Sequence, residues 1–511
     1  MPPPYILEPG RRVNAWDYEF EWTSEHYTPE QLKPMIYTYD ELASTALDRL
    51  DEIAAESRSK ESPPTSTSSP PSTSPPPYSE SPPTSPSSPP STSPPPHSDS
   101  TSPPSCPHTK TTTLFSLLQS HSSDPLLSPL WTQLTTTPPW VSPAQLSRGQ
   151  KIFYRYLGPS IVGLTFQALL GGFGSARIAT TLSLTGGFSP RFARRRLLET
   201  FQHVLDITSS LPAITPPTGR GFVSTVKVRL LHASVRRKIL SMSNEREGWF
   251  DVKENGIPCN DLDSIGTITA FSTMLLFIGF PRQGIWLGEG EKEDYLALWR
   301  YVAYLLGTPT APFESVRTAR VWLESLIVSE IRPSAVSKRL GENMINSLAL
   351  TPPTYASRDF LRAEGYWLNG PALSKELGIG RPRWWYLVLV GGQCGYFMAV
   401  SYVKKYLLPR KWEERQIERL KKLLREMTVK EAGGKEAGFE FRYVPSWKQL
   451  HQTTGDEKGV VVEESQKDGF RNRWTEWRNL MAAVLLLTVL GWLGWLSTRM
   501  VCRGVVRMVT R

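Results

Sequence analysis

The chain has 511 residues, 45 of them proline, a formal net charge of +10 and four widely separated cysteines. The positive charge favours an anionic partner, but the sequence lacks the zinc-finger, helix-turn-helix and aromatic-strand patterns of nucleic-acid-binding proteins. The isolated cysteines argue against a disulfide framework and against a cysteine-based zinc site.

Residues 1–57 have the pattern of a partly helical segment. Thr28 is a typical helix cap with Pro29 in the first turn, and apolar residues recur at helical spacing over residues 40–56. This segment either packs on the main domain or stays loose. The first residues contain no apolar stretch of the kind that a cleaved signal peptide needs, so we expect none.

Residues 58–112 consist almost entirely of Ser, Thr and Pro, and residues 61–79 are repeated nearly unchanged as residues 80–98. Such a segment has almost no apolar side chains to bury, so burial cannot offset the entropy lost on ordering. We predict a disordered linker with polyproline character. A role as a proline-rich or phosphorylated binding motif is the alternative.

Residues 113–445 have the pattern of a helical domain in which alternating, strand-like runs are scarce. Ser189 is the expected N-cap of one helix, with Pro190 at its first position. Residues 292–307 carry an apolar stripe at helical spacing and end at Gly307, a typical helix terminator. We therefore predict a mainly α fold.

The C-terminal part has three segments. Residues 446–478 form a polar linker, and residues 479–498 are an uncharged run of about 30 Å as a helix, the thickness of a bilayer core. Tryptophans near both ends and arginines along the basic tail 499–511 suit the two lipid interfaces. We predict a transmembrane helix that anchors a cytosolic protein by its C-terminus; a buried core helix is the alternative.

A second apolar run covers residues 384–403. Its length would allow a membrane span, but it contains Gln393 and several glycines and lies inside the helical domain. We predict a buried helix here.

Two histidines, His203 and His232, fall on predicted helices inside the domain. On a helical wheel His203 points about 160° away from the apolar face of its helix. His232 shares the apolar face of its own helix with Val228, Leu231 and Val235. From this pattern alone, a packed core histidine is the more typical explanation, and a ligand is the alternative.

Four blocks of the sequence resemble, in the same order, the catalytic domain shared by rubber oxygenases (latex clearing proteins) and the ER-bound oxygenase of mycophenolic acid biosynthesis. The blocks are residues 138–200, 229–237, 256–272 and 293–309. The resemblance ends at residues 441–445. It implies a helical, globin-like core that holds haem b.

The resemblance also implies a site. The segment "RLLHASVRR" is similar to the one that supplies the axial iron ligand, which places that role on His232. Arg177 and Thr181 match two residues of the distal side, but a lysine of the family is replaced by Thr180. The segment similar to the one with the family's catalytic glutamate has Gln167 and no acidic residue. The sixth iron position is then open or water-bound, and any base comes from elsewhere.

Two further clusters have alternative explanations. Asp261 and Asp263 would suit a metal loop, but helix capping and internal hydrogen bonds are the more typical roles of such residues. The run 194–196 of three arginines could contact haem propionates or membrane phosphates, although a solvated helix start is the more common explanation.

Together these features predict a membrane-anchored, haem-dependent, dioxygenase-like enzyme, with its catalytic domain on the cytosolic side of the endoplasmic reticulum. Its partners would be membrane lipid and an apolar, isoprenoid or lipid-like substrate that is attacked at a C=C bond. One alternative is an inactive membrane protein of the same fold that binds a lipid or another apolar ligand. Another is a haem-free oxidase that uses a different metal.

Overall fold

The computed structural model describes residues 5–61, residues 113–439 except 247 and 408, residues 444–445 and residue 481. The predicted polar linker, transmembrane helix and basic tail therefore lie outside the described residues, apart from Met481. The predicted Ser/Thr/Pro linker also lies outside them beyond residue 61, while residues 58–61 belong to a helix.

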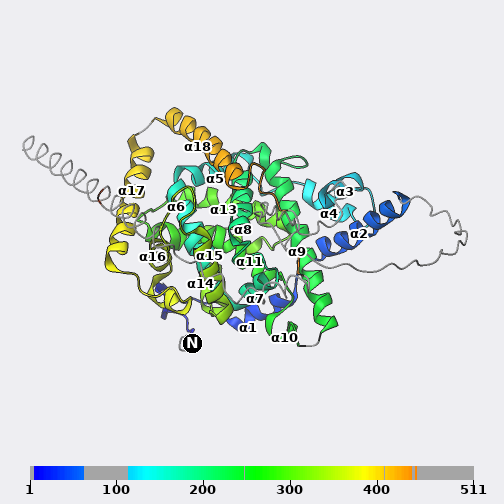
Figure 1. Ribbon diagram of the computed structural model, residues 1–511, viewed down its shortest axis with the longest axis horizontal. Helices are drawn as coiled ribbons and strands as arrows, with labels where there is room; N and C mark the ends of the chain where they lie inside the picture. Colours follow the sequence, from blue (N-terminus) through cyan, green and yellow to red (C-terminus); the bar gives the residue numbers. More distant parts are fainter. Residues whose placement is uncertain are drawn as a thin grey trace, which may run out of the picture.

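The described fold is mainly helical, as predicted (Figure 1). The α-helices are α1 (Pro29–Leu32), α2 (Glu41–Glu61), α3 (Leu114–Ser120), α4 (Ser128–Thr135), α5 (Pro143–Arg155), α6 (Leu157–Val162), α7 (Ala176–Leu184), α8 (Ala193–Thr208), α9 (Arg220–Glu245), α10 (Val252–Asn255), α11 (Asp261–Phe271), α12 (Phe280–Arg282), α13 (Glu289–Leu306), α14 (Val316–Glu330), α15 (Ala335–Leu348), α16 (Arg358–Glu376), α17 (Trp384–Leu407) and α18 (Arg410–Glu431). Shorter 3₁₀ turns are η1 (Lys33–Tyr37), η3 (Pro212–Ile214) and η5 (Ala311–Phe313), and π-helical segments are η2 (Gly163–Leu170) and η4 (Leu275–Gly279).

The N-terminal segment packs on the main domain. It begins with an antiparallel hairpin of β1 (Arg12–Ala15) and β2 (Tyr18–Glu21), which the sequence did not predict. Thr28 caps α1 as predicted, in a capping box. The buried His26 places its Nε2 2.9 Å from a carboxylate oxygen of Glu324 on α14. These contacts make the N-terminal residues part of the folded domain.

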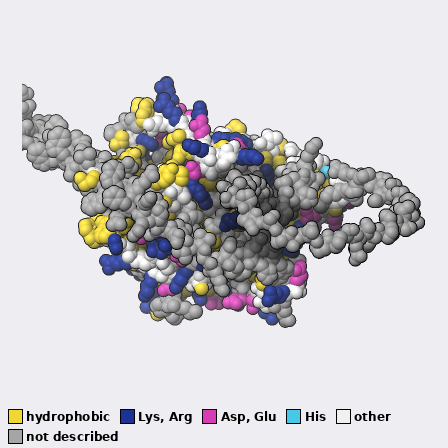
Figure 2. All heavy atoms as spheres, viewed as in Figure 1, with side chains coloured by type: hydrophobic (Ala, Val, Ile, Leu, Met, Phe, Trp, Pro, Cys, Tyr) yellow, Lys and Arg dark blue, Asp and Glu magenta, His cyan; other side chains and the backbone are white. Residues whose placement is uncertain are grey.

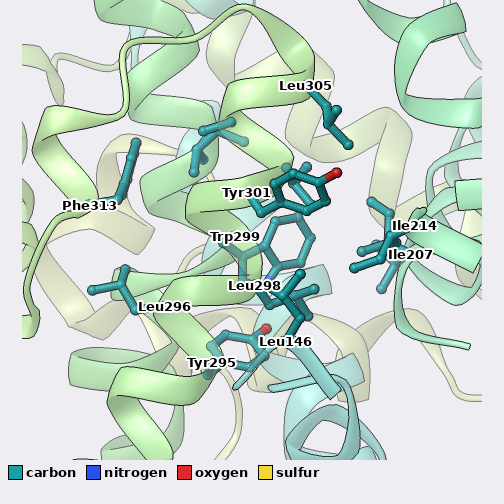
Figure 3. Close-up of a cluster of buried hydrophobic side chains, with 14 of the residues drawn as sticks. Leu146, Ile207, Ile214, Tyr295, Leu296, Leu298, Trp299, Tyr301, Leu305 and Phe313 are labelled. Carbon is teal, nitrogen blue, oxygen red and sulfur yellow. The ribbon is translucent and has the colours of Figure 1, made fainter. Parts of the chain in front are cut away.

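The hydrophobic core surrounds α13. Figure 3 shows Trp299, Tyr295 and Tyr301 of this helix pointing toward apolar side chains of neighbouring elements, among them Leu146 of α5. The Trp299 ring stacks on Phe271 with 5.0 Å between centroids. The helix ends at Gly307 as predicted, because this residue has a φ of +74°, which glycine adopts without strain.

The predicted start of α8 was wrong. Ser189 is not its N-cap, and the helix begins at Ala193 with Phe192 in the cap position. The preceding residues form a turn in which Gly186 has a φ of +67° and Phe188 is buried in the apolar core. Burial of Phe188 thus takes precedence over the local capping signal.

The prediction for residues 384–403 was right about the helix and wrong about its burial. One face of α17 packs against α16, but the opposite face exposes several large apolar side chains. Among the described helices, two are long and apolar enough to cross a membrane by length and composition. These are residues 261–282, which are mostly buried, and residues 384–406, which are mostly not.

Candidate functional site

A large cavity of about 1200 Å³ lies among the helices of the domain. Its walls come from α6, η2, α7, α8, α9, α11, α16, α17 and α18, and most of the lining side chains are apolar. His232 on α9 lines the cavity, and so does Glu364 on α16. The cavity therefore brings together two ionisable groups that are 132 positions apart in the sequence.

His232 has the state that iron ligation requires. Burial, followed by the positive charges of Arg236 and Arg196, lowers the pKa of its imidazole to about 4, so the ring is neutral near pH 7. The described residues offer this ring no hydrogen-bond partner. A neutral imidazole with a free nitrogen facing a cavity is suited to axial ligation of haem iron.

The helix around His232 is fixed on both sides. Val228, Leu231 and Val235 of α9 belong to one buried apolar cluster. On the flank of that face, Arg229 donates hydrogen bonds of 2.6 and 2.8 Å to the carboxylate of Asp40. The N-terminal segment therefore holds α9 in place, and with it the imidazole.

His203 does not line the cavity, but it is buried, contrary to the helical-wheel prediction. Its Nδ1 lies 2.7 Å from the hydroxyl oxygen of Ser224, and its ring packs edge-on against Phe439. Burial, then Arg196 and His232, lowers the pKa of His203 to about 3. The helical-wheel prediction for His203 was wrong because α9 and Phe439 cover the polar face of α8.

Arg177 and Thr181, the predicted distal pair, are not among the residues that line the cavity. The face of α7 toward the cavity carries Ile178 and Leu182. Because each preceding position is rotated by about 100°, Arg177 and Thr181 point elsewhere. The role of this pair in catalysis stays a prediction.

Arg177 instead forms a buried ion-pair cluster. Its Nη2 lies 2.8 Å from a carboxylate oxygen of Asp263 and 2.7 Å from one of Glu330. Asn260 caps α11 by accepting the Asp263 amide hydrogen and donates to the Asp263 carboxylate at 2.9 Å. The expectation of capping and internal hydrogen bonding is thus confirmed for Asp263.

Two of the three consecutive arginines also reach the cavity, contrary to the expectation of a solvated helix start. Arg194 and Arg196 are among the lining residues. Arg194 pairs with Glu431 of α18, and the Arg196 guanidinium lies 4.7 Å from the centre of the Phe439 ring. Both cations therefore lie at the cavity wall, Arg194 in an ion pair and Arg196 over an aromatic ring.

Glu364 is the acidic group that the sequence analysis missed. It is buried, and its Oε1 accepts a hydrogen bond of 2.6 Å from the side-chain amide of Gln393 on α17. Burial raises the pKa of Glu364 to about 7, although the hydrogen bond from Gln393 acts in the opposite direction. A carboxyl with such a pKa can exchange a proton near neutral pH.

A signal for Glu364 was present in the sequence. Leu361, Glu364, Gly365 and Leu368 recur at helical spacing, and all are buried. A carboxylate within an apolar helix face is rare unless it is paired or functional. The family resemblance does not point to Glu364, because the segment similar to the family's glutamate-bearing one is residues 164–172.

The cavity fits a haem group. Gly172 and Gly266 line it, and a Cβ added to either residue would meet no atom within 4 Å. Open space, an apolar lining, a neutral imidazole and two arginines match the ring, the iron and the propionates of haem b.

No cluster of three or more His, Cys, Asp or Glu side chains suited to a metal occurs among the described residues.

Comparison with known proteins finds similarity to one solved structure and to one family model. The solved structure of latex clearing protein LCP in the closed state has 18% sequence identity and a TM-score of 0.45, covering 60% of this chain and 79% of that one. No curated protein sequence matches the chain. The family model described as "ER-bound oxygenase mpaB/B'/Rubber oxygenase, catalytic domain" matches residues 154–392. Residues 154–392, a little under half of the chain, therefore match the catalytic-domain model of this oxygenase family.

Proposed function

We propose that this protein is a haem-dependent oxygenase of the endoplasmic reticulum membrane that attacks a C=C bond of an apolar substrate, with its catalytic domain in the cytosol. One observation carries the proposal: the neutral imidazole of His232 faces a cavity of about 1200 Å³ within an oxygenase-family domain. The mostly apolar lining supports an isoprenoid or lipid-like substrate, and the ER-bound character of the matched family supports the location.

His232 would hold the iron of haem b, and Arg194 and Arg196 at the cavity wall would be the cations nearest to its propionates. When bound, haem supplies the binding and activation of O2. The protein contributes a fixed imidazole, since the buried contacts of α9 leave the ring little freedom to move. The apolar walls exclude water, which strengthens every electrostatic interaction inside the cavity.

Glu364 would accept a proton from the substrate. Gln393 donates to Oε1 and so orients the carboxyl group, while Oε2 has no hydrogen-bond partner among the described residues. With a pKa of about 7, the group is partly ionised at neutral pH and returns the proton readily after the reaction. Glu364 thereby takes the role that Gln167 cannot fill, because an amide does not accept a proton.

A second candidate function is lipid binding without conversion. The replacement of the family's lysine by Thr180, together with the ion-pair cluster that holds Arg177 away from the cavity, favours this alternative. In that case the cavity would take an apolar ligand and no haem.

The visible absorption spectrum of the purified full chain separates the two functions. The full chain is needed because the N-terminal residues pack on the domain. We expect a Soret band that His232→Ala abolishes and that His203→Asn leaves intact, since asparagine preserves the hydrogen bond to Ser224. Failure to take up haem supplied in excess would refute the oxygenase proposal and support lipid binding.

A further inference from the structure

A stripe of exposed apolar side chains runs along α17. Its members are Trp384, Val388, Tyr396, Val403 and Tyr406, and both ends of the stripe, Trp384 and Tyr406, are 71% exposed. At about 100° per residue these five positions fall within an arc of roughly 120°, so they form one continuous face. Figure 2 shows hydrophobic side chains gathered at the left of the molecule, where Figure 1 places α16 and α17.

The opposite face of the same helix is packed. Tyr386, Leu389, Val390 and Cys394 form a buried cluster with Ala363 of α16. A helix that is apolar on all sides is expected either in a protein core or in contact with lipid. Because the domain covers only one side of α17, its other side lacks an apolar partner among the described residues.

Charged groups occur only at the two ends of the stripe, where Lys404 and Lys405 lie between Val403 and Tyr406. No Asp, Glu, Lys or Arg lies between residues 384 and 403, a length of about 30 Å as a helix. Arg381 and Arg383 precede this segment and Lys404 follows it. Aromatic rings and cations at both ends suit the head-group region of a bilayer, where lipid phosphates attract the cations.

The surroundings of α17 favour a helix that lies in the membrane surface over one that crosses it. Its packed partner α16 carries Arg358, Asp359 and Arg362 in its first turns. A spanning α17 would draw these ionisable side chains into hydrocarbon, at a cost of several kcal/mol for each charge. An in-plane orientation buries the stripe alone and leaves α16 in water.

The cavity opens beside this stripe. Tyr396 lines the cavity and is also 51% exposed. Pro353, Thr354 and Tyr355 of the loop between α15 and α16 also line the cavity and are exposed, so the cavity wall reaches the surface at this loop as well. From Tyr396 inward, the wall continues over Phe397 of α17. An apolar molecule beside the stripe would therefore reach the cavity without passing through water.

We infer that α17 lies in the plane of the membrane surface with its stripe among the acyl chains, so that the cavity receives its substrate directly from the bilayer between Tyr396 and Tyr355. The nature of the substrate rests on the proposed function, whereas the position of α17 on the membrane does not. The predicted C-terminal anchor would keep the protein at the membrane, and α17 would fix its orientation there.

Site-directed fluorescence in vesicles tests this position. Cysteines are introduced singly at Val388, Tyr396 and Val403 of a full chain whose four native cysteines are replaced by alanine, and each is labelled with bimane. The control is Leu42→Cys, another exposed apolar position. It lies on α2, the helix that Figure 1 shows on the side of the molecule opposite α17. The vesicles contain phosphatidylcholine, phosphatidylserine and a doxyl-labelled lipid.

We expect the doxyl lipid to reduce the fluorescence at the three α17 positions at least twofold, and to leave the label at position 42 unchanged. Iodide in the aqueous phase should show the reverse preference. Quenching of the α17 labels by iodide would overturn the inference, because the stripe would then face water. Protection from both quenchers would overturn it too, since a second copy or residues 479–498 would then cover the stripe. Neither readout requires haem, so failure here is distinguishable from failure of the Soret test.

Discussion

The cavity has two unlike walls. On one side, α9 is enclosed by apolar packing and by the ion pair between Arg229 and Asp40, and it presents His232. On the other side, α16 and α17 present Glu364 and Gln393, while the outer face of α17 is exposed. Under the proposed function, this difference would give the walls separate tasks: the enclosed wall would fix a ligand, and the half-exposed wall would exchange substrate with the surroundings.

The enclosed wall should lose the most stability when one of its charges is removed. Replacing Arg229 by leucine leaves the carboxylate of Asp40 largely buried and unpaired, so we expect the free energy of unfolding to fall by about 3–5 kcal/mol. Arg237, on the same helix, forms exposed ion pairs with Asp48 and Asp51, and Arg237→Leu should cost no more than about 1 kcal/mol. Urea unfolding of both variants measures this contrast, and equal losses would show that α9 is not fixed by the Asp40 pair.

On the half-exposed wall, the buried Glu364 should make the free energy of unfolding depend on pH. The native pKa of Glu364, about 7, lies above the ordinary value of 4.5, so the native state retains its proton longer than the unfolded state. The contribution of protonated Glu364 to the free energy of unfolding is therefore fully present below pH 4.5 and is lost as the pH rises to about 7. It amounts to about 3 kcal/mol, from roughly 2.5 pKa units at 1.36 kcal/mol each.

Glu364→Gln should remove this contribution while preserving the shape of the side chain. The difference in unfolding free energy between the native chain and the variant should therefore change by about 3 kcal/mol between pH 4.5 and pH 7. Urea titrations at both values provide the measurement. A difference that is independent of pH would mean that Glu364 titrates normally and is a poor proton acceptor for the proposed reaction.

The smallest contrast lies within α17 itself. Val390 is buried against α16, so Val390→Ala should cost about 2 kcal/mol through the cavity it leaves. Val388, two positions earlier on the exposed stripe, should change the free energy of unfolding by less than about 0.5 kcal/mol when replaced by alanine in detergent-free buffer. A large loss at Val388 would indicate that protein covers the stripe.

The sequence predicted those features that depend on local pattern. Thr28 and Gly307 end their helices as expected, because capping needs only the residue and its immediate neighbours. His232 was placed on an apolar face by the same short-range spacing, and the structure puts it at the cavity.

What the sequence could not predict depends on contacts between distant segments. The turn that buries Phe188 moves the start of α8 to Ala193. Phe439 packs on His203 and buries it, although the sequence pattern predicts a polar, exposed face there. Glu364 lies at the cavity wall where α16 packs against α17, a contact between separate helices. The outer face of α17 stays exposed since the domain covers one side only, which no local pattern specifies.

The central claim is that His232 holds haem in this cavity, and the visible spectrum of His232→Ala tests it most directly. The account predicts that the full chain, purified in the presence of haem, shows a Soret band that is lost in His232→Ala and kept in His203→Asn. A Soret band of equal intensity in His232→Ala, or none in the unaltered chain, would contradict it.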